Sequence, residues 1–144
     1  MDEQLVTLFV SQVREHFEFL VLDYGFAEPL VELRPDVYSA IVVFMGNNVA
    51  IEFVLDEREE HIECRIARVV DGERSRHYAV DENRRRVREN LFGLLRRRGV
   101  TNWISISLAG LSLEKQIPRK LDALAKNLRA NSQDILADLP GILD

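Results

Sequence analysis

Two groups of charged side chains are the residues of this chain that could do chemistry. Seven arginines lie between positions 84 and 98, and the segment 56–60 is entirely charged and mostly acidic. A guanidinium group binds phosphate or carboxylate through paired hydrogen bonds, so clustered arginines suit an anionic ligand. On a helix over 84–98, four of them would share the outward arc: Arg85, Arg86, Arg96 and Arg97.

The arginine group has three interpretations. It can be solvated or paired with carboxylates of the same chain, it can contact an acidic protein, or it can contact nucleic-acid phosphates. The net charge of −5 opposes unspecific binding to phosphates. Binding of single-stranded nucleic acid also requires aromatic residues that interleave with the basic ones, and the aromatic residues of this segment do not. The first interpretation, a solvated or intramolecularly paired face, is therefore favoured.

The acidic segment indicates binding rather than acid–base catalysis. Its carboxylates lie in a charged loop with nothing apolar beside them to raise a pKa, so we expect a solvated turn. A turn of this kind can present negative charge to a basic protein. Its candidate partner-binding residues are Asp56, Glu57, Glu59 and Glu60.

The other reactive residue types favour a protein that is not an enzyme. The three histidines are dispersed, and there is one cysteine. His61 and Cys64 lie an odd number of residues apart, which on a strand directs them to opposite faces and excludes a shared metal. His16 lies at the edge of a helical stripe and is expected to be structural. No nucleophile elbow, phosphate-binding loop or dinucleotide motif is present, so we expect no catalytic residue, metal or cofactor.

The elements that must position these charges centre on residues 39–70. Three apolar runs there, 41–45, 49–55 and 62–70, are separated by turn-forming residues and predict an antiparallel meander. Matching their alternation places Glu52 opposite Arg65 and Phe53 opposite Cys64. One face, which carries Phe53, is expected to be buried, and the face with Glu52 is expected to be wet. The first run is apolar on both faces and is expected to be the more central strand.

Helices and weaker strands flank this meander. Apolar spacing predicts helices over 3–24, 84–98 and 113–130, with Asp81 or Asn83 capping the second, and a short terminal helix after Ser132. Pro29 and Pro35 bracket an edge strand over 30–33, and 76–80 is a weaker fifth strand. Residues 100–112 receive no assignment. The prediction is an α+β fold with an N-terminal helix, an antiparallel sheet of four or five strands, and two or three C-terminal helices on one sheet face.

Composition is that of one cytoplasmic domain. A chain of 144 residues, 47% hydrophobic, can bury one core, so residues 1–144 are expected to form a single domain. The acidic start does not resemble a signal peptide, no apolar run is long enough to span a bilayer, and a single cysteine fits a reducing compartment. Residues 1–64 carry 14 acidic and 3 basic residues, and residues 65–98 carry 5 acidic and 11 basic ones. Such a split favours salt bridges between the halves, or two oppositely charged patches.

Three apolar residues of the first helix, Leu8, Phe19 and Leu22, lie off its main stripe. They are either scattered surface residues or a second contact, made with the tail of the chain or with another subunit in a homodimer.

The order of several core segments resembles that of a group of small bacterial α+β proteins. It is carried by Tyr24-Gly25-Phe26, by Ala40 to Phe44 and by Asn47 to Glu52. Some immunity proteins of bacterial toxin systems are similar in size and layout. The resemblance and the charges together predict a non-catalytic cytoplasmic protein-binding module, an immunity-type inhibitor with a basic partner. The alternative is nucleic-acid or anion binding through the arginines of 84–98.

Overall fold

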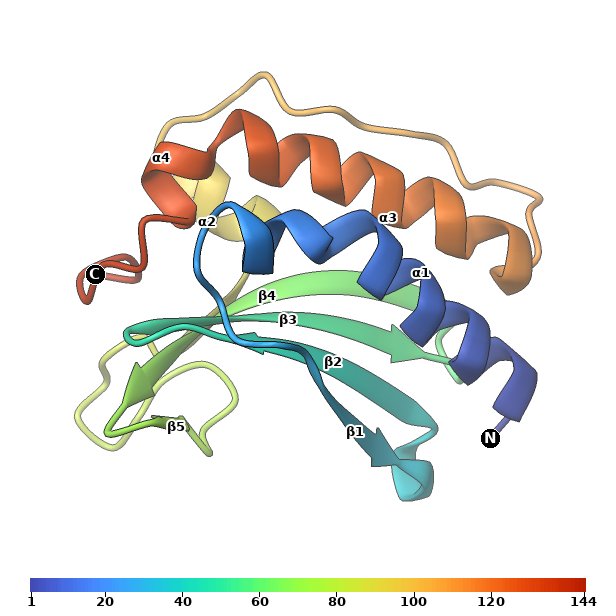
Figure 1. Cartoon of the computed structure of the whole chain (residues 1–144), viewed down its shortest axis with the longest axis horizontal. Helices are drawn as coiled ribbons and strands as arrows, with labels where there is room; N and C mark the ends of the chain where they lie inside the picture. The colour runs from blue at the N-terminus through green and yellow to red at the C-terminus, as the bar shows by residue number, and fades with distance from the viewer.

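An antiparallel sheet with two long helices across one face makes up the protein, and the computed structural model describes all residues, 1–144 (Figure 1). The expected α+β fold is confirmed. The elements in chain order are α1 (Glu3–Leu22), β1 (Leu30–Arg34), the 3-10 turn η1 (Pro35–Val37), β2 (Ser39–Met45), β3 (Val49–Asp56), β4 (His61–Val70), β5 (Glu73–Arg74), β6 (Arg88–Asn90), α2 (Leu91–Arg97), α3 (Leu113–Ala130) and α4 (Ser132–Ile135).

The strands follow one another in space in the order β1-β2-β3-β4-β5, and β6 pairs with the outer side of β4. In the β3–β4 pair Glu52 lies opposite Arg65 and Phe53 opposite Cys64, which confirms the predicted register. β2 lies between β1 and β3 and is internal, but β3 is the central strand of the order, so the expectation that the run apolar on both faces is the more central strand is wrong. β1 forms the edge that its flanking prolines predict.

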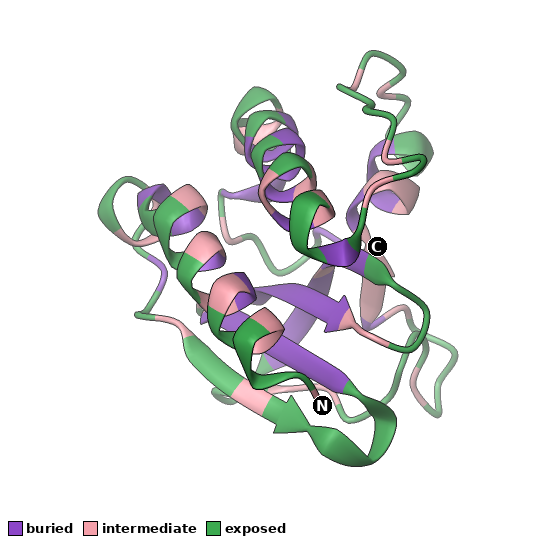
Figure 2. Cartoon of the chain, turned by 90° about the vertical axis from the view of Figure 1, so that its right-hand side faces the viewer, coloured by how far each residue is buried: buried purple, intermediate pink, exposed green.

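The helices α1 and α3 cover the face of the sheet that carries Phe53. Their buried sides turn toward the strands, as Figure 2 shows in purple, and Phe53 itself is fully buried. The ring of Phe17 from α1 lies over that of Phe53, with 3.9 Å between centroids. This face was predicted correctly, because alternation in β3 and β4 marks it directly.

The opposite face was expected to be wet, and that expectation is wrong for its centre. Glu52 is only 2% exposed, and Ala50, Val54 and Ala67 beside it are buried as well. The segment from β5 to β6 folds back beneath this face, on the side away from the helices (Figure 1). A second, smaller apolar cluster lies on this face of the sheet, and Arg74 and Arg88 neutralise the carboxylate of Glu52.

Two predicted elements differ from the structure. The weak strand over 76–80 is a loop with a single bridge, Val80 to Arg86, and β5 lies earlier, at Glu73–Arg74. The predicted arginine-rich helix over 84–98 does not begin at Arg84, whose positive φ of 62° lies outside the right-handed helical region. Residues 88–90 pair with β4 instead, and only Leu91–Arg97 are helical.

Asp81 caps a turn rather than a helix. Its carboxylate accepts hydrogen bonds from the amides of Asn83 and Arg85, each at 2.9 Å. The cap of α2 is Asn90, whose side chain accepts from the amide of Phe92 at 2.9 Å.

Residues 100–112 form a strap without regular structure that runs along the outer side of α3 (Figure 1). Asn127 of α3, 1% exposed, holds it: its side chain accepts from the amide of Ile104 at 2.7 Å and donates to the carbonyl of Ile104 at 2.9 Å. None of the helices has the length and apolar character needed to cross a membrane.

Candidate functional site

Three of the four outward arginines are engaged by carboxylates of the chain. Arg85 contacts Asp144 at 3.3 Å, and Arg86 and Arg97 contact the same carboxylate, that of Glu89, at 3.0 and 2.9 Å. Arg96 is exposed at the end of α2 and has no ion pair. The arginines therefore do not form one free basic surface.

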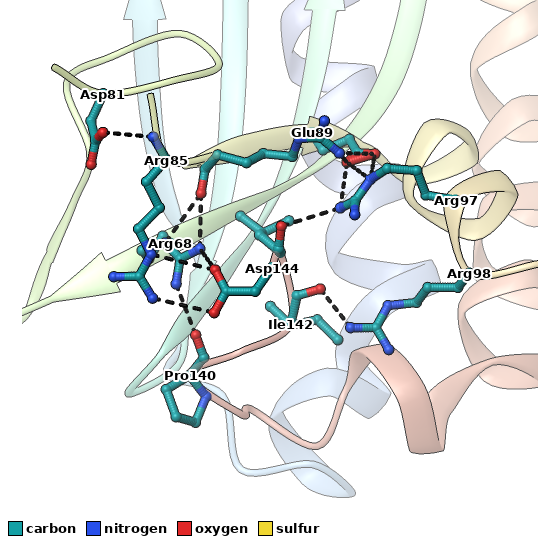
Figure 3. A network of polar contacts seen from close by, with 11 residues as sticks. Arg68, Asp81, Arg85, Glu89, Arg97, Arg98, Pro140, Ile142 and Asp144 are labelled. Atoms are coloured by element: carbon teal, nitrogen blue, oxygen red, sulfur yellow. Dashed lines mark hydrogen bonds and ion pairs between the residues drawn. The ribbon is translucent and has the colours of Figure 1, made fainter. Parts of the chain in front are cut away.

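Arginines also hold the segment 140–144 against the body of the protein, as Figure 3 shows. Arg68, which is buried on β4, donates to the carbonyl of Pro140 at 2.9 Å and to the carboxylate of Asp144 at 2.8 Å. Arg97 and Arg98 donate to carbonyls of the same segment at 3.2 and 2.6 Å. Two apolar side chains between these contacts are buried in the core: Ile142 and Leu143.

These pairs change the pKa values of the groups involved. Burial alone would raise the pKa of Glu89, but the hydrogen bond and charge of Arg97, with those of Arg86, outweigh burial and hold that pKa below its ordinary value. The hydrogen bond to Glu89 in turn raises the pKa of Arg97. Hydrogen bonds from Arg85 and Arg68 lower the pKa of Asp144. The three shifts favour the ionised pairs at neutral pH.

A second polar cluster lies under the sheet and centres on Glu52. The carboxylate of Glu52 accepts from Arg74 and, at 2.8 Å, from Nε of Arg88. Arg74 also pairs with Glu32 on β1, and Arg88 donates to the carbonyls of Ser75 and His77. Both guanidinium groups are thus paired within the chain, and the cluster ties residues 74–88 to the sheet.

The acidic segment 56–60 forms the turn between β3 and β4, as expected, and its members differ in their freedom. Asp56 accepts from the amide of Glu59 at 3.1 Å, and Glu57 accepts from the amide of Asp2 at 3.0 Å. The second carboxylate oxygen of Glu57 is buried and accepts no hydrogen bond. Glu59 and Glu60 are exposed and have no ion pair, so they are the members that another molecule can reach.

This turn lies beside the first turns of both long helices. The N-terminus, the turn after β3 and the start of α3 gather at the right-hand end of Figure 1. A groove of about 400 Å³ opens between them. Three leucines line it, and three carboxylates stand around them. The lining residues are Asp2, Gln4, Leu5, Leu8, Glu60, Ser112, Leu113 and Glu114.

We call this surface the acidic groove. Its carboxylates at Asp2 and Glu114 lie at the N-terminal ends of helices, where the helix dipole stabilises negative charge. Sequence reasoning found Glu60 but not the groove. The available signal was that both long helices begin with acidic residues, yet only their parallel arrangement brings those starts together.

Leu8, Phe19 and Leu22 have different surroundings, whereas His16 and Cys64 have structural roles. Phe19 is buried, with the guanidinium of Arg129 of α3 4.1 Å from its ring, whereas Leu22 is exposed and Leu8 lines the acidic groove. The three therefore do not form one patch. The ring of His16 contacts the carbonyl of Gln12 at 2.8 Å. Burial raises the pKa of the Cys64 thiol, which keeps it protonated and unreactive.

Comparison with known proteins gives no relative. No protein-family model, no curated protein and no solved structure matches the chain.

Proposed function

We propose that this chain is a non-catalytic module that binds a basic protein through the acidic groove, in the manner of an immunity-type inhibitor of a cationic toxin. The observation that supports it best is the combination of three leucines with carboxylates in one groove of about 400 Å³. Apolar side chains at the centre of an interface supply affinity, while charges at its rim steer the partner and accelerate association.

The charge of the surrounding segments supports a basic partner. Residues 1–8, 56–60 and 112–115 together hold seven acidic and two basic side chains. Glu3, Glu59, Glu60 and Glu114 are exposed and make no ion pair within the chain. Their negative charge is therefore available to lysine or arginine side chains of another protein.

The alternative, nucleic-acid or anion binding through the arginines, has less support. Arg85, Arg86 and Arg97 are already paired with Asp144 and Glu89, and freeing them would expose those carboxylates to the phosphates. Each phosphate contact on duplex DNA would add about 0.9 to the slope of log affinity against log salt. A titration with duplex and single-stranded DNA at several salt concentrations measures that slope directly.

Affinity capture with a matched charge control tests the proposal. The wild-type chain is immobilised and exposed to lysate of its source cell, and the captured proteins are identified and quantified. The groove variant Glu59→Lys/Glu60→Lys/Glu114→Lys is expected to lose a basic protein that the wild type retains stoichiometrically. The control variant, Glu28→Lys/Glu82→Lys/Asp134→Lys, makes the same change in net charge elsewhere and is expected to retain it.

Three results would contradict the proposal. Equal loss in both variants would mean that net charge alone holds the partner. Salt-sensitive DNA binding that disappears in Arg85→Glu/Arg96→Glu would favour the alternative. Turnover of a substrate by the purified chain, abolished by one polar substitution, would show an enzyme.

A further inference from the structure

The strand β1 is an edge whose outer side has no partner in the chain. It pairs with β2 alone, and the other end of the sheet continues through β4 to β5 and β6. Its apolar side chains are unusually exposed: Leu30 by 59%, Val31 by 40% and Leu33 by 55%. An edge of this kind offers backbone hydrogen-bonding groups to another strand.

The hydrogen-bond pattern of the sheet tells which groups of β1 point outward. In an antiparallel pair, alternate residues bond to the strand on one side, and the residues between them bond to the strand on the other. The amide of Gly46 donates to the carbonyl of Val49, and the amide of Glu57 donates to the carbonyl of Tyr38. The even-numbered residues of β2 therefore direct their backbone groups toward β3. The odd-numbered residues of β2 therefore bond toward β1.

The register of β1 with β2 then fixes the outer edge. Leu30, Glu32 and Arg34 lie opposite odd-numbered residues of β2 and direct their backbone groups inward. The N–H and C=O groups of Val31 and Leu33 consequently point away from the sheet. Pro29 and Pro35 occupy the next outward places and have no N–H, so the edge offers two donors only.

A second copy of the same chain fits this edge. Antiparallel pairing of β1 with β1 is symmetric and closes as a dimer, because each chain has one such edge. Three two-fold symmetric registers, centred on Val31, Glu32 or Leu33, let the outward backbone groups of Val31 and Leu33 take part in the pairing. Centring on Glu32 would place two glutamates face to face, which is unfavourable, and centring on Val31 would place Glu32 opposite an apolar Leu30.

Centring on Leu33 gives complementary charges. Each Glu32 then lies opposite Arg34 of the second copy, and the two Leu33 residues lie opposite each other. Glu32 and Arg34 are already neighbours on the same face of β1, with 3.6 Å between the carboxylate of Glu32 and the guanidinium of Arg34. The dimer would therefore form a row of alternating charges. The two Leu33 residues would exchange both of their backbone hydrogen bonds, whereas the carbonyl of Pro35, opposite Val31, already accepts from the amide of Tyr38 in η1.

We propose that two copies of the chain associate through β1, antiparallel and centred on Leu33, so that their sheets become one. Val31 and Leu33 lie on the helix side of the sheet, because they pair with Val42 and Ala40 of the main core. The dimer would therefore cover two exposed apolar side chains of each copy.

Mass in solution tests the association. The purified wild-type chain, measured by sedimentation from about 1 to 200 µM, is expected to dimerise. Leu33→Pro is expected to be monomeric with an unchanged circular dichroism spectrum, because the N–H it removes is not used within the chain. Leu33→Thr keeps that N–H and is expected to dimerise. A wild type that stays monomeric overturns the proposal, and it is the result expected if the edge instead pairs with an extended segment of another protein. A dimeric Leu33→Pro overturns it as well.

Cross-linking tests the register. In a Cys64→Ala background, Leu33→Cys is expected to form a disulfide-linked dimer on mild oxidation, since directly opposed residues lie about 5.5 Å apart at Cα. Val31→Cys is expected not to, because the two copies of residue 31 lie four positions apart along the strand. Linkage through Val31→Cys instead would overturn the assignment.

Charge reversal gives an independent measurement. Arg34→Glu is expected to weaken the dimer about tenfold at low salt, because it places like charges opposite each other twice. Arg119→Glu on α3 makes the same change in net charge away from the edge and is expected to leave the dissociation constant unchanged. Equal effects of the two variants would overturn the proposed pairing.

Discussion

A carboxylate that is 2% exposed is tolerated only when its charge is matched, and Glu52 is matched by two guanidinium groups. Taking Glu52 out of water costs several kcal/mol, which the contacts with Arg74 and Arg88 offset. The contacts of Glu52 therefore add little to the net stability of the protein, and their main effect is to fix the position of a segment. They determine where the segment 74–88 lies on the sheet.

Removing the charge of Glu52 should destabilise the protein strongly. Glu52→Gln would leave Arg74 and Arg88 partly buried without their shared counter-charge, and we expect the free energy of unfolding to fall by about 3–5 kcal/mol. Urea denaturation measures it. Glu60→Gln, an exposed control with no ion pair, should change it by no more than about 0.5 kcal/mol. Equal effects would contradict the role assigned to Glu52.

Glu89 should make the stability depend on pH. Its pKa is lowered from an ordinary 4.5 when the protein folds, so near that pH the unfolded chain binds more protons than the folded one. The stability that Glu89 contributes is fully present above pH 4.5 and is lost as the pH falls through the folded pKa. Asp144, whose pKa is also lowered, should contribute in the same direction over a lower range.

The test compares urea denaturation of wild type and Glu89→Gln at about pH 7 and about pH 3. We expect the wild type to lose more stability than the variant between these conditions, because the variant has no carboxylate to protonate at this position. An identical loss in both proteins would show that the pairs with Arg86 and Arg97 do not contribute to folding.

At the scale of elements, Asn127 makes two of the side-chain hydrogen bonds that hold the strap over 100–112, and Gln116 makes a third, to the carbonyl of Leu111. Asn127→Leu would remove both hydrogen bonds to Ile104. We expect chymotrypsin, which prefers large apolar residues, to cleave this segment about tenfold faster in the variant, because local opening becomes easier. Lys126→Leu, an exposed position next to it, is the control. Equal cleavage rates would show that the strap is held by other contacts.

Elements with a clear period were predictable, and those made by tertiary contacts were not. β3 and β4 are eight and ten residues long and alternate, so the burial of the face that carries Phe53 and the pairing of Phe53 with Cys64 followed from the sequence. β6 is three residues long, too short to show a period, and forms because the outer side of β4 is free to pair. The arginines beside it fit a helical wheel equally well, which produced the erroneous helix over 84–98.

The same distinction applies to the candidate site. The exposed turn at Glu59 and Glu60 follows from the local run of charge. The acidic groove does not, because its floor comes from Leu5 and Leu113, more than a hundred residues apart in the chain. The burial of Glu52 was missed for a related reason. Alternation describes one strand and contains no information about a segment that later folds beneath it.

At the scale of the whole molecule, the uneven charge of the sequence is partly cancelled inside the structure. Glu32 and Glu52, from the acidic half, pair with Arg74 and Arg88 of the basic half, as the split in charge predicted. The carboxylates left unpaired in the acidic half include those at the acidic groove. The molecule therefore has one acidic end, and most arginines of 84–98 are occupied at the other.

The strap, both long helices and the segment 140–144 contribute to one continuous core, so the chain should unfold as a single unit. Trp103 is the one tryptophan, and it lies on the strap with its ring 5.9 Å from that of Phe92. Its fluorescence reports the strap and α2, whereas far-ultraviolet circular dichroism reports all helices. For a two-state domain the two signals must change at the same urea concentration, and we expect coincident midpoints for the wild type.

Asn127→Leu provides the contrast that makes this measurement decisive. With the strap released, the Trp103 signal should change at lower urea than the circular dichroism signal, because Phe92 and Trp103 separate before the sheet and the long helices unfold. Phe53 of β3 packs against Phe17 of α1, so both transitions of Phe53→Ala should move together, to lower urea by an amount equivalent to about 3–5 kcal/mol. A wild-type protein whose Trp103 transition precedes the other would show instead that the strap and α2 form a separate unfolding unit, and that residues 1–144 are not one cooperative domain.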